Sequence, residues 1–158
     1  MRKFKVIKKY ENSDIALPVR STEKSAGYDL AAAEDVVVPS IFKKNEEGEL
    51  PKMKGTLIPT GVKAYCEDNE YVALHARSSL FNKKGLILAN ATGIIDSDYA
   101  DNPDNEGHIF FNVINLNSED VVISKGEKIG QAIFNPFQLT DDDAAKGSRL
   151  GGWGSTDK

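Results

Sequence analysis

Short runs of β-branched and aromatic residues, separated by turn-forming residues, constrain the fold of this chain more than any other feature. Such side chains favour strands because they pack well on a pleated surface. Glycines and prolines fall mostly between the runs, where turns need them. Many short strands with almost no helical periodicity predict an all-β sandwich or barrel. The runs are Phe4–Ile7, Val36–Val38, Leu57–Cys66, Tyr71–Leu74, Ile109–Leu116, Val121–Ile123 and Ile129–Phe137.

Some segments depart from this pattern. Pro59 and Pro136 lie inside apolar runs, so their strands are expected to be sheet edges or to carry bulges. The best candidate for a helix is Ser79–Lys84, one or two turns long. The polar segment Lys43–Lys54 is expected to be a long surface loop. Thr140–Lys158 has too little apolar surface to fold alone, which predicts a mobile tail.

The composition excludes several classes of protein. A chain of 158 residues with 40% hydrophobic residues suits one domain, and its net charge of −4 argues against a nucleic-acid binder. Cys66 is the single cysteine, and His75 and His108 are too few to propose a zinc site. Five Lys/Arg in the first nine residues precede no apolar segment, and no run approaches a membrane span of roughly 18–20 residues. We therefore expect a cytoplasmic protein without a membrane segment.

The C-terminal residues combine groups that bind nucleotides. The stretch from Arg149 to Thr156 holds one cation, three glycines, Trp153 and two hydroxyl groups. Glycines let backbone N–H groups approach an anion, and Arg, Ser and Thr bind phosphate oxygens. An indole can stack on a nucleobase. The alternative is a frayed terminus with an incidental tryptophan.

A second stretch, Ala76–Leu80, follows an apolar run with one arginine and two serines. A strand end that leads into a helix is a plausible phosphate site, because N–H groups at a helix start point outward. The alternative is a serine that caps the helix beside a surface arginine.

The stretch Gly93–Tyr99 ends an apolar segment at Asp96, and a carboxylate in a cleft there could act as a general base toward water. A calcium loop fails on spacing, because Asp101 stands where that loop requires glycine and Gly107 where it requires glutamate. An ordinary Asp-rich turn remains the alternative. Ser25–Leu30 and Lys125–Gln131 are weaker signals of the same turn-and-strand kind.

Taken in order, these stretches resemble the five ordered motifs of the trimeric dUTP diphosphatases (dUTPases). Each motif alone is weak, but five in order across nearly the whole chain form a specific signal. The matching stretches are Ser25–Ala32, Ala76–Leu80, Gly93–Tyr99, Lys125–Ile133 and Arg149–Thr156.

The resemblance implies a jelly-roll-like β-barrel over residues 1–139 and a mobile, glycine-rich arm over residues 140–158 that closes over the active site. It implies a homotrimer with three active sites at subunit junctions. The implied reaction is hydrolysis of dUTP to dUMP and diphosphate with Mg²⁺, which limits uracil incorporation into DNA and supplies dUMP for thymidylate synthesis.

Roles are carried over residue by residue. Asp96 would activate the attacking water, Tyr99 would pack beneath the deoxyribose and exclude a 2′-hydroxyl, and Trp153 would stack on uracil. The metal would have no direct protein ligand, with Asp29 acting through water. Asn90 and Gly93 would flank the hairpin that reads the uracil edge. The phosphates would be contacted by Arg77, Ser78 and Gln131 and covered by Arg149, Ser155 and Thr156; Ser79, Ile109 and Gly154 complete the implied substrate site.

The chain departs from the family pattern at three motifs. Ala76 and Ser79 replace the usual proline and glycine of the second motif, and Trp153 replaces the phenylalanine of the fifth. The segment Ala100–Glu106 is longer and more acidic than the usual turn of the third motif. This segment puts the outline of the base pocket in doubt.

Two other functions compete with this one. A dCTP deaminase shares the fold and has elements like Arg77-Ser78-Ser79 and Gly107-His108-Ile109, but Asn112 stands where that enzyme needs a glutamate to shuttle protons. A nucleotide-gated regulator would bind a protein partner through Ala100–Glu106 or Lys43–Lys54. A β-domain without activity is the plainest alternative.

Overall fold

The computed structural model describes residues 1–147, Arg149 and Gly151, and it confirms the all-β prediction. The predicted residues Trp153, Gly154, Ser155 and Thr156 lie outside the described residues. The strands are β1 (Lys3–Val6), β2 (Val19–Arg20), β3 (Tyr28–Ala31), β4 (Val36–Val38), β5 (Thr56–Pro59), β6 (Val62–Tyr65), β7 (Glu70–Ala76), β8 (Leu86–Leu88), β9 (Gly93–Asp96), β10 (Phe110–Asn115), β11 (Val121–Ile123) and β12 (Lys128–Pro136).

Each predicted apolar run overlaps a strand, and the run Leu57–Cys66 overlaps two. The chain turns between β5 and β6 at Gly61, whose φ of +73° lies in the left-handed region that favours glycine. Two 3₁₀ turns, η1 (Lys8–Tyr10) and η2 (Ser97–Tyr99), complete the regular structure together with one short helix.

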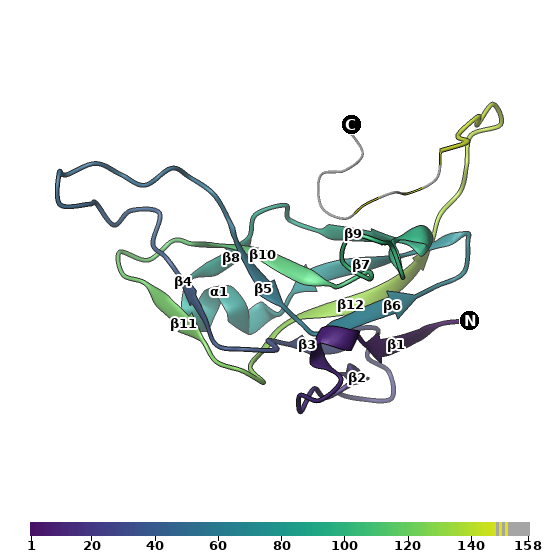
Figure 1. Cartoon of the computed structure of the whole chain (residues 1–158), viewed down its shortest axis with the longest axis horizontal. Coiled ribbons are helices and arrows are strands. Elements are labelled where there is room, and N and C mark those ends of the chain that lie inside the picture. The colour runs from purple at the N-terminus through teal and green to yellow at the C-terminus, as the bar shows by residue number, and fades with distance from the viewer. Residues whose placement is uncertain (148, 150, 152–158) are drawn as a thin grey trace.

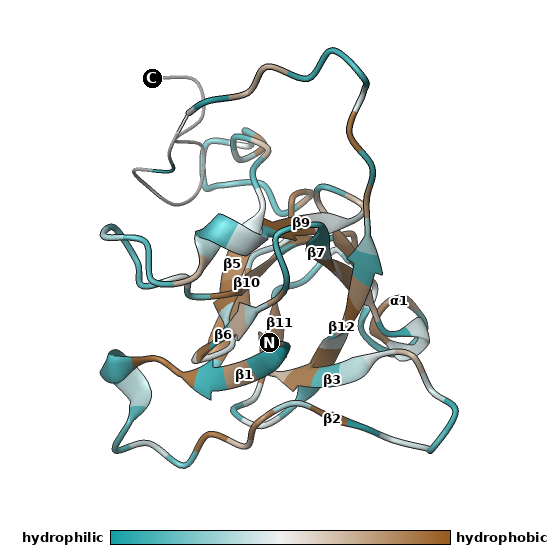
Figure 2. Ribbon diagram, turned by 90° about the vertical axis from the view of Figure 1, so that its right-hand side faces the viewer, coloured by the Kyte–Doolittle hydropathy of each residue, from teal (hydrophilic) through white to brown (hydrophobic). Residues whose placement is uncertain are grey.

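The strands form four antiparallel sheets (Figure 1). The largest has the order β2-β3-β12-β7-β9, and the others are β5-β10-β8, β1-β6 and β11-β4. Figure 2 shows these sheets around a common interior, with hydrophobic residues on β7, β10 and β12. The fully buried side chains of Leu30, Ile58, Leu74, Phe111 and Ile129 form its centre.

The hydrogen-bonded ladders of the described strands do not close into one barrel. The strands β4 and β11 pair only with each other, and β1 pairs only with β6. Strands of three or four residues end before they meet a second neighbour. The predicted jelly-roll-like barrel is therefore confirmed in its β content but not in its closure.

The two prolines lie where the pairing tolerates a missing N–H group. Pro59 ends β5, which is an edge strand of its sheet. Pro136 ends β12, beyond the residues that pair with β3, so β12 has a neighbour there on one side only. β12 also carries a register shift between Lys128 and Gly130. Both predictions are confirmed, although this shift lies at the opposite end of β12 from Pro136.

Helix α1 (Ser78–Lys84) lies where a short helix was expected. It buries Leu80 and ends at Gly85, whose φ of +63° forms a left-handed C-cap with its N–H donated to the carbonyl of Phe81. The segment Lys43–Lys54 is an exposed loop without strands or helices, as predicted, and it projects from the body in Figure 1. In the described part of the chain, no helix is long and apolar enough to cross a membrane.

His108 is a buried residue of the core. Its Nε2 accepts a hydrogen bond of 2.9 Å from the N–H of Gly61, and its ring centroid lies 4.0 Å from that of Phe110. Burial lowers the pKa of His108 to about 4, and the charge of Lys9 lowers it further than Glu106 raises it. The folded chain therefore keeps this imidazole neutral under mildly acidic conditions.

This burial predicts a pH-dependent stability. Between about pH 6.5 and 4 the unfolded chain binds a proton at His108 that the folded chain does not, so stability falls as the pH falls. Over this whole pH range, the free energy of unfolding falls by about 3 kcal/mol. His108→Gln keeps an acceptor for Gly61 but cannot titrate. In urea unfolding experiments between pH 7 and pH 5, the free energy of unfolding should fall less steeply with falling pH for His108→Gln than for the wild type. Equal pH dependence in the two proteins would contradict the inference that His108 is neutral in the folded chain.

Candidate active site

One cluster on the outer face of the five-stranded sheet contains the predicted site residues Asp29 and Gln131. Asp29 on β3, Gln131 on β12 and His75 on β7 are direct neighbours in the register, so their side chains share one face. Gln131 also packs over Gly27, where a Cβ atom would lie 2.0 Å from the Gln131 side-chain oxygen. The glycine of the first motif therefore makes room for the glutamine of the fourth.

Asp29 organises the charges of this cluster. Its side chain is 9% exposed and accepts hydrogen bonds from the Lys128 Nζ at 2.9 Å and the Ser21 Oγ at 2.8 Å, while the Arg77 Nε lies 3.5 Å away. Burial opposes ionisation, but Lys128, Ser21 and Arg77 together hold the pKa of Asp29 below its usual range. The carboxylate is ionised and orients both cations.

Lys128 and Ser21 had no predicted role. Lys128 lies inside the fourth motif and pairs with Ala31. Because Ala31 is two residues from Asp29 on β3, Lys128 lies on the same face of the sheet as Asp29. Regular alternation would place Lys128 and Gln131, three residues apart, on opposite faces of β12, and the register shift between Lys128 and Gly130 brings them onto the same face. No local pattern in the sequence could have assigned Lys128.

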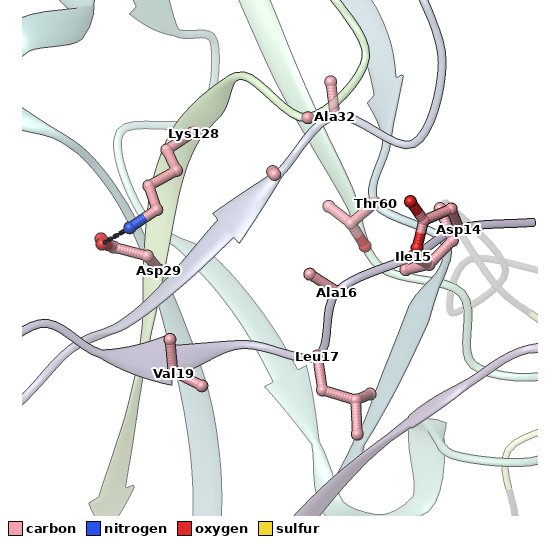
Figure 3. Close-up of a pocket in the computed structure, with 11 residues that line it drawn as sticks. Asp14, Ile15, Ala16, Leu17, Val19, Asp29, Ala32, Thr60 and Lys128 are labelled. Carbon is pink, nitrogen blue, oxygen red and sulfur yellow. Dashed lines mark hydrogen bonds and ion pairs between the residues drawn. The ribbon is translucent and has the colours of Figure 1, made fainter.

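A pocket of about 300 Å³ opens beside this cluster (Figure 3). The ion pair of Asp29 and Lys128 forms one wall. The segment from Asp14 to Leu17 and the residue Thr60 also line the pocket. Arg77 lies at the end of β7, directly before α1, so the charged wall of the pocket adjoins the second motif. Ser78 is exposed and Ser79 partly buried in the first turn of that helix.

A second cluster surrounds Asp96. This residue ends β9 opposite Tyr71, and it lines a pocket of about 240 Å³ with Ile94, Tyr71 and Phe137. Arg149 reaches this cluster from the chain beyond β12. Its Nη2 lies 2.5 Å from Asp96 and its Nε 2.7 Å from Asp98. The hydrogen bond to Asp98 raises the pKa of Arg149 further.

Arg149 thus contacts the predicted general base in this structure. Its guanidinium carbon also lies 5.7 Å from the ring centroid of Tyr99. The predicted role of Arg149 at the phosphates stays a prediction. The described part of the arm between Thr140 and Gly147 is exposed and contains no strand or helix.

The turn between β8 and β9, which pair with β10 and β7 and not with each other, holds the residues expected to read the base. Asn90 is exposed in this turn, and Gly93 is buried opposite Leu74. Ile109 is fully buried, and its backbone already bonds within the chain: its N–H donates to Val62 and its carbonyl accepts from Thr60. In this structure the backbone of Ile109 therefore binds the turn between β5 and β6.

The two clusters lie far apart in one chain. Asp96 stands opposite Tyr71 near the start of β7, and Arg77 follows six residues after Tyr71. A strand rises about 3.3 Å per residue, so the two positions are separated by about 20 Å. The structure therefore brings Arg77, Gln131 and Asp29 together, and separately Asp96, Tyr99 and Arg149, but it does not join the two groups.

The available carboxylates fit a metal ion that is held mainly by a ligand. Among residues 1–147, 149 and 151, no three His, Cys, Asp or Glu side chains come close enough to bind a metal. Asp29 is engaged by Arg77 and Lys128, and Asp96 by Arg149. Mg²⁺ often keeps several waters and binds through phosphate oxygens, which needs no carboxylate cage.

Comparison with known proteins identifies the family. A family model described as dUTPase matches residues 13–149. The chain is 48% identical over 158 residues to the deoxyuridine 5′-triphosphate nucleotidohydrolase of Lactococcus lactis, covering 99% of this chain and 97% of that protein. It is 37% identical to the enzyme of the same name from Hahella chejuensis, covering 96% and 93%.

Solved structures agree. The dUTPase from Streptococcus mutans superposes with a TM-score of 0.75 at 41% identity, covering 87% of this chain and 98% of that one. The dUTPase of the Staphylococcus aureus phage phi11 has a TM-score of 0.67 at 18% identity, which shows the shared fold alone. The match extends over most of the chain and includes both clusters on the five-stranded sheet. The chain therefore belongs to the dUTPase family, and it is an enzyme that hydrolyses dUTP.

Proposed function

We propose that this dUTPase releases diphosphate from dUTP through attack of a water molecule on the α-phosphorus, with Asp96 as the general base. The supporting observation is the position of Asp96, whose half-exposed carboxylate ends β9 beside a small pocket. A carboxylate there can accept a proton from water as the water attacks. The products are dUMP and diphosphate, and their formation limits uracil incorporation into DNA and supplies dUMP for thymidylate synthesis.

The phosphate chain would be held by the other cluster. Arg77 is oriented by Asp29 and can bind phosphate oxygens through its remaining N–H groups, while Gln131 offers an amide on the same face. Ser78 offers an exposed hydroxyl beside Arg77. Mg²⁺ bound to the phosphates would neutralise part of their negative charge. Positive groups aimed at these oxygens stabilise the charge that builds up during attack.

The distance between the clusters favours an active site shared by subunits. The phosphorus atoms of a triphosphate are joined by single oxygens, so one phosphate chain does not bridge about 20 Å along β7. A site with both clusters forms when Asp96 of one chain faces Arg77 of another. This geometry supports the homotrimer with three sites at subunit junctions.

The outer face of β10 also fits contact with another chain. The Oδ1 atom of Asn112 is buried without a hydrogen-bond partner among the described residues, which costs free energy unless a donor reaches it. The side chain of Leu57 is paired with Asn112 on this face and is exposed, as is that of Ile87 beside Ile114. A neighbouring subunit would cover the exposed side chains of Leu57 and Ile87.

The competing functions gain no support from the geometry. Asn112 points away from the core of its own chain on β10 and cannot replace the glutamate of a deaminase. In the segment Ala100–Glu106, the carboxylates of Asp101 and Glu106 bind Lys63 within the chain, which accounts for them without a protein partner. The loop Lys43–Lys54 remains an exposed surface for such a partner, without an observation that favours one.

The experiment that tests this function is a Mg²⁺-dependent assay of diphosphate release from dUTP, dCTP, dTTP and UTP, with the products identified. We expect release from dUTP to exceed release from the other three, with dUMP as the product. Formation of a uracil nucleotide from dCTP would support the deaminase instead, and no reaction with dUTP would contradict the proposal.

Substitution of the base gives a sharper test. Asp96→Asn removes the proton acceptor and keeps the shape of the side chain, so kcat should fall by roughly 10²–10⁴-fold while dUTP binding is largely retained. Asp98→Asn removes the same charge two residues away, also from Arg149, and should lose less than about tenfold. Single-turnover kinetics and binding by calorimetry measure both effects. Equal losses in the two variants would remove Asp96 from its role.

A further inference from the structure

Lys63 is a buried cation with two carboxylate partners. Its side chain, on β6, is 8% exposed, and its Nζ lies 2.5 Å from the Asp101 Oδ1 and 2.7 Å from the Glu106 Oε1. Burial alone would lower the pKa of Lys63, but the hydrogen bonds to Asp101 and Glu106 outweigh it and raise the pKa above its usual value. Lys63 is therefore charged and holds both ends of the acidic segment.

The segment that Lys63 holds has an unusual backbone. Asp101 and Glu106 both have left-handed φ values, of +61° and +62°, which are uncommon outside glycine. The Asp101 N–H donates to the carbonyl of Glu106 at 3.2 Å and closes the loop. Gly107 follows with φ of +82°, and a Cβ atom there would lie 2.8 Å from the carbonyl oxygen of Tyr99. Such a conformation persists where surrounding contacts fix it.

The closed loop binds Tyr99 at two points. The Asn105 Nδ2 donates to the Tyr99 hydroxyl at 2.8 Å, and that hydroxyl donates to the carbonyl of His108 at 3.0 Å. The Asn102 Nδ2 donates to the Tyr99 carbonyl at 2.8 Å, while the Asn102 Oδ1 accepts from the N–H groups of Asp104 and Asn105. The ring of Tyr99 is thereby fixed from the hydroxyl and from the backbone.

The loop is tied to the rest of the chain as well. The Tyr65 hydroxyl donates to Asp101 at 2.8 Å, and the N–H of Lys8 donates to Glu106 at 3.0 Å. Both contacts come from the β1–β6 side of the molecule and converge on the carboxylates that Lys63 binds. Lys63 binds both of these carboxylates, so its charge joins the hydrogen bonds from Tyr65 and Lys8 into one network.

We propose that Lys63 is a positioning residue for Tyr99: by binding Asp101 and Glu106 it closes the segment 100–107, which fixes the ring that excludes a 2′-hydroxyl. The inference rests on the proposed function and on the role that the family resemblance implies for Tyr99, which is to pack beneath the deoxyribose of dUTP. Discrimination between deoxyribose and ribose depends on a steric fit, and small displacements of a packed ring relax such a fit. The longer acidic segment of this chain is thus a support for sugar selection.

The test compares kcat/KM for dUTP and UTP in Lys63→Met. The methionine fills a similar volume without the charge, so the loop loses its closure, and the preference for dUTP over UTP should fall by roughly tenfold or more. The triple variant Lys63→Met, Asp101→Asn, Glu106→Gln removes all three charges together. It guards against misfolding caused by two unpaired carboxylates, and it should lose the preference to a similar extent.

The matched control is Lys84→Met. Lys84 is a half-buried lysine paired with Glu127 at 3.1 Å, away from the segment 100–107. Loss of the Lys84 charge should lower the free energy of unfolding without changing the ratio of kcat/KM for dUTP to kcat/KM for UTP. Hydrogen exchange of peptides within residues 97–110, followed by mass spectrometry, should be faster in Lys63→Met and unchanged in Lys84→Met.

The outcomes separate the inference from the function beneath it. A wild-type enzyme that prefers dUTP, beside folded Lys63 variants with the same preference and the same exchange, overturns the role of Lys63 alone. A wild-type chain that does not hydrolyse dUTP overturns the proposed function, and the sugar-selection role with it. If Lys84→Met lost as much of the preference for dUTP over UTP as Lys63→Met, the loss would reflect lower stability in general. That result would also overturn the inference.

Discussion

Strand β7 is hydrogen-bonded to β12 along its whole length on one edge and to β9 along Tyr71–Leu74 on the other. A strand paired on both edges cannot bend to bring its ends together. Its length therefore decides the layout of the site, with Arg77 at one end and Asp96 beside the other. The same rigid sheet presents both groups on one face. Under the proposed function, a complete site requires a second chain, and the proposed homotrimer follows from this local constraint.

Two buried or half-buried charges organise the polar groups around this frame. Asp29 holds Arg77 and Lys128 on the phosphate side, and Lys63 holds Asp101 and Glu106 beneath Tyr99. In each case a charge inside the fold is matched by two partners of opposite sign, because an unmatched buried charge is costly. These ion pairs say little about the total free energy of unfolding, but they orient the groups that the proposed function places around the substrate.

Local patterns in the sequence predicted the strands, the short helix, the surface loop and the motif residues. Their signals lie within a few residues, as with the alternation in β10 or the glycine after α1. The break at Gly61 was missed because the run Leu57–Cys66 was interpreted as one strand, although Pro59, Thr60 and Gly61 together are typical of a turn. The bond of Lys63 to Asp101 and Glu106 spans 38 and 43 residues, and no local pattern reveals such a pairing. The same holds for the open barrel and for the distance between Asp96 and Arg77, which depend on strand register.

The shared active site is the central claim, and subunit mixing tests it most directly. Arg77→Ala and Asp96→Asn chains should each form an inactive enzyme, because each lacks one half of every site. Mixed assemblies of the two chains contain junctions where an intact Asp96 faces an intact Arg77, so dUTP hydrolysis should return in part. Mixed assemblies, verified by native mass spectrometry, that stay as inactive as their parents would contradict the account.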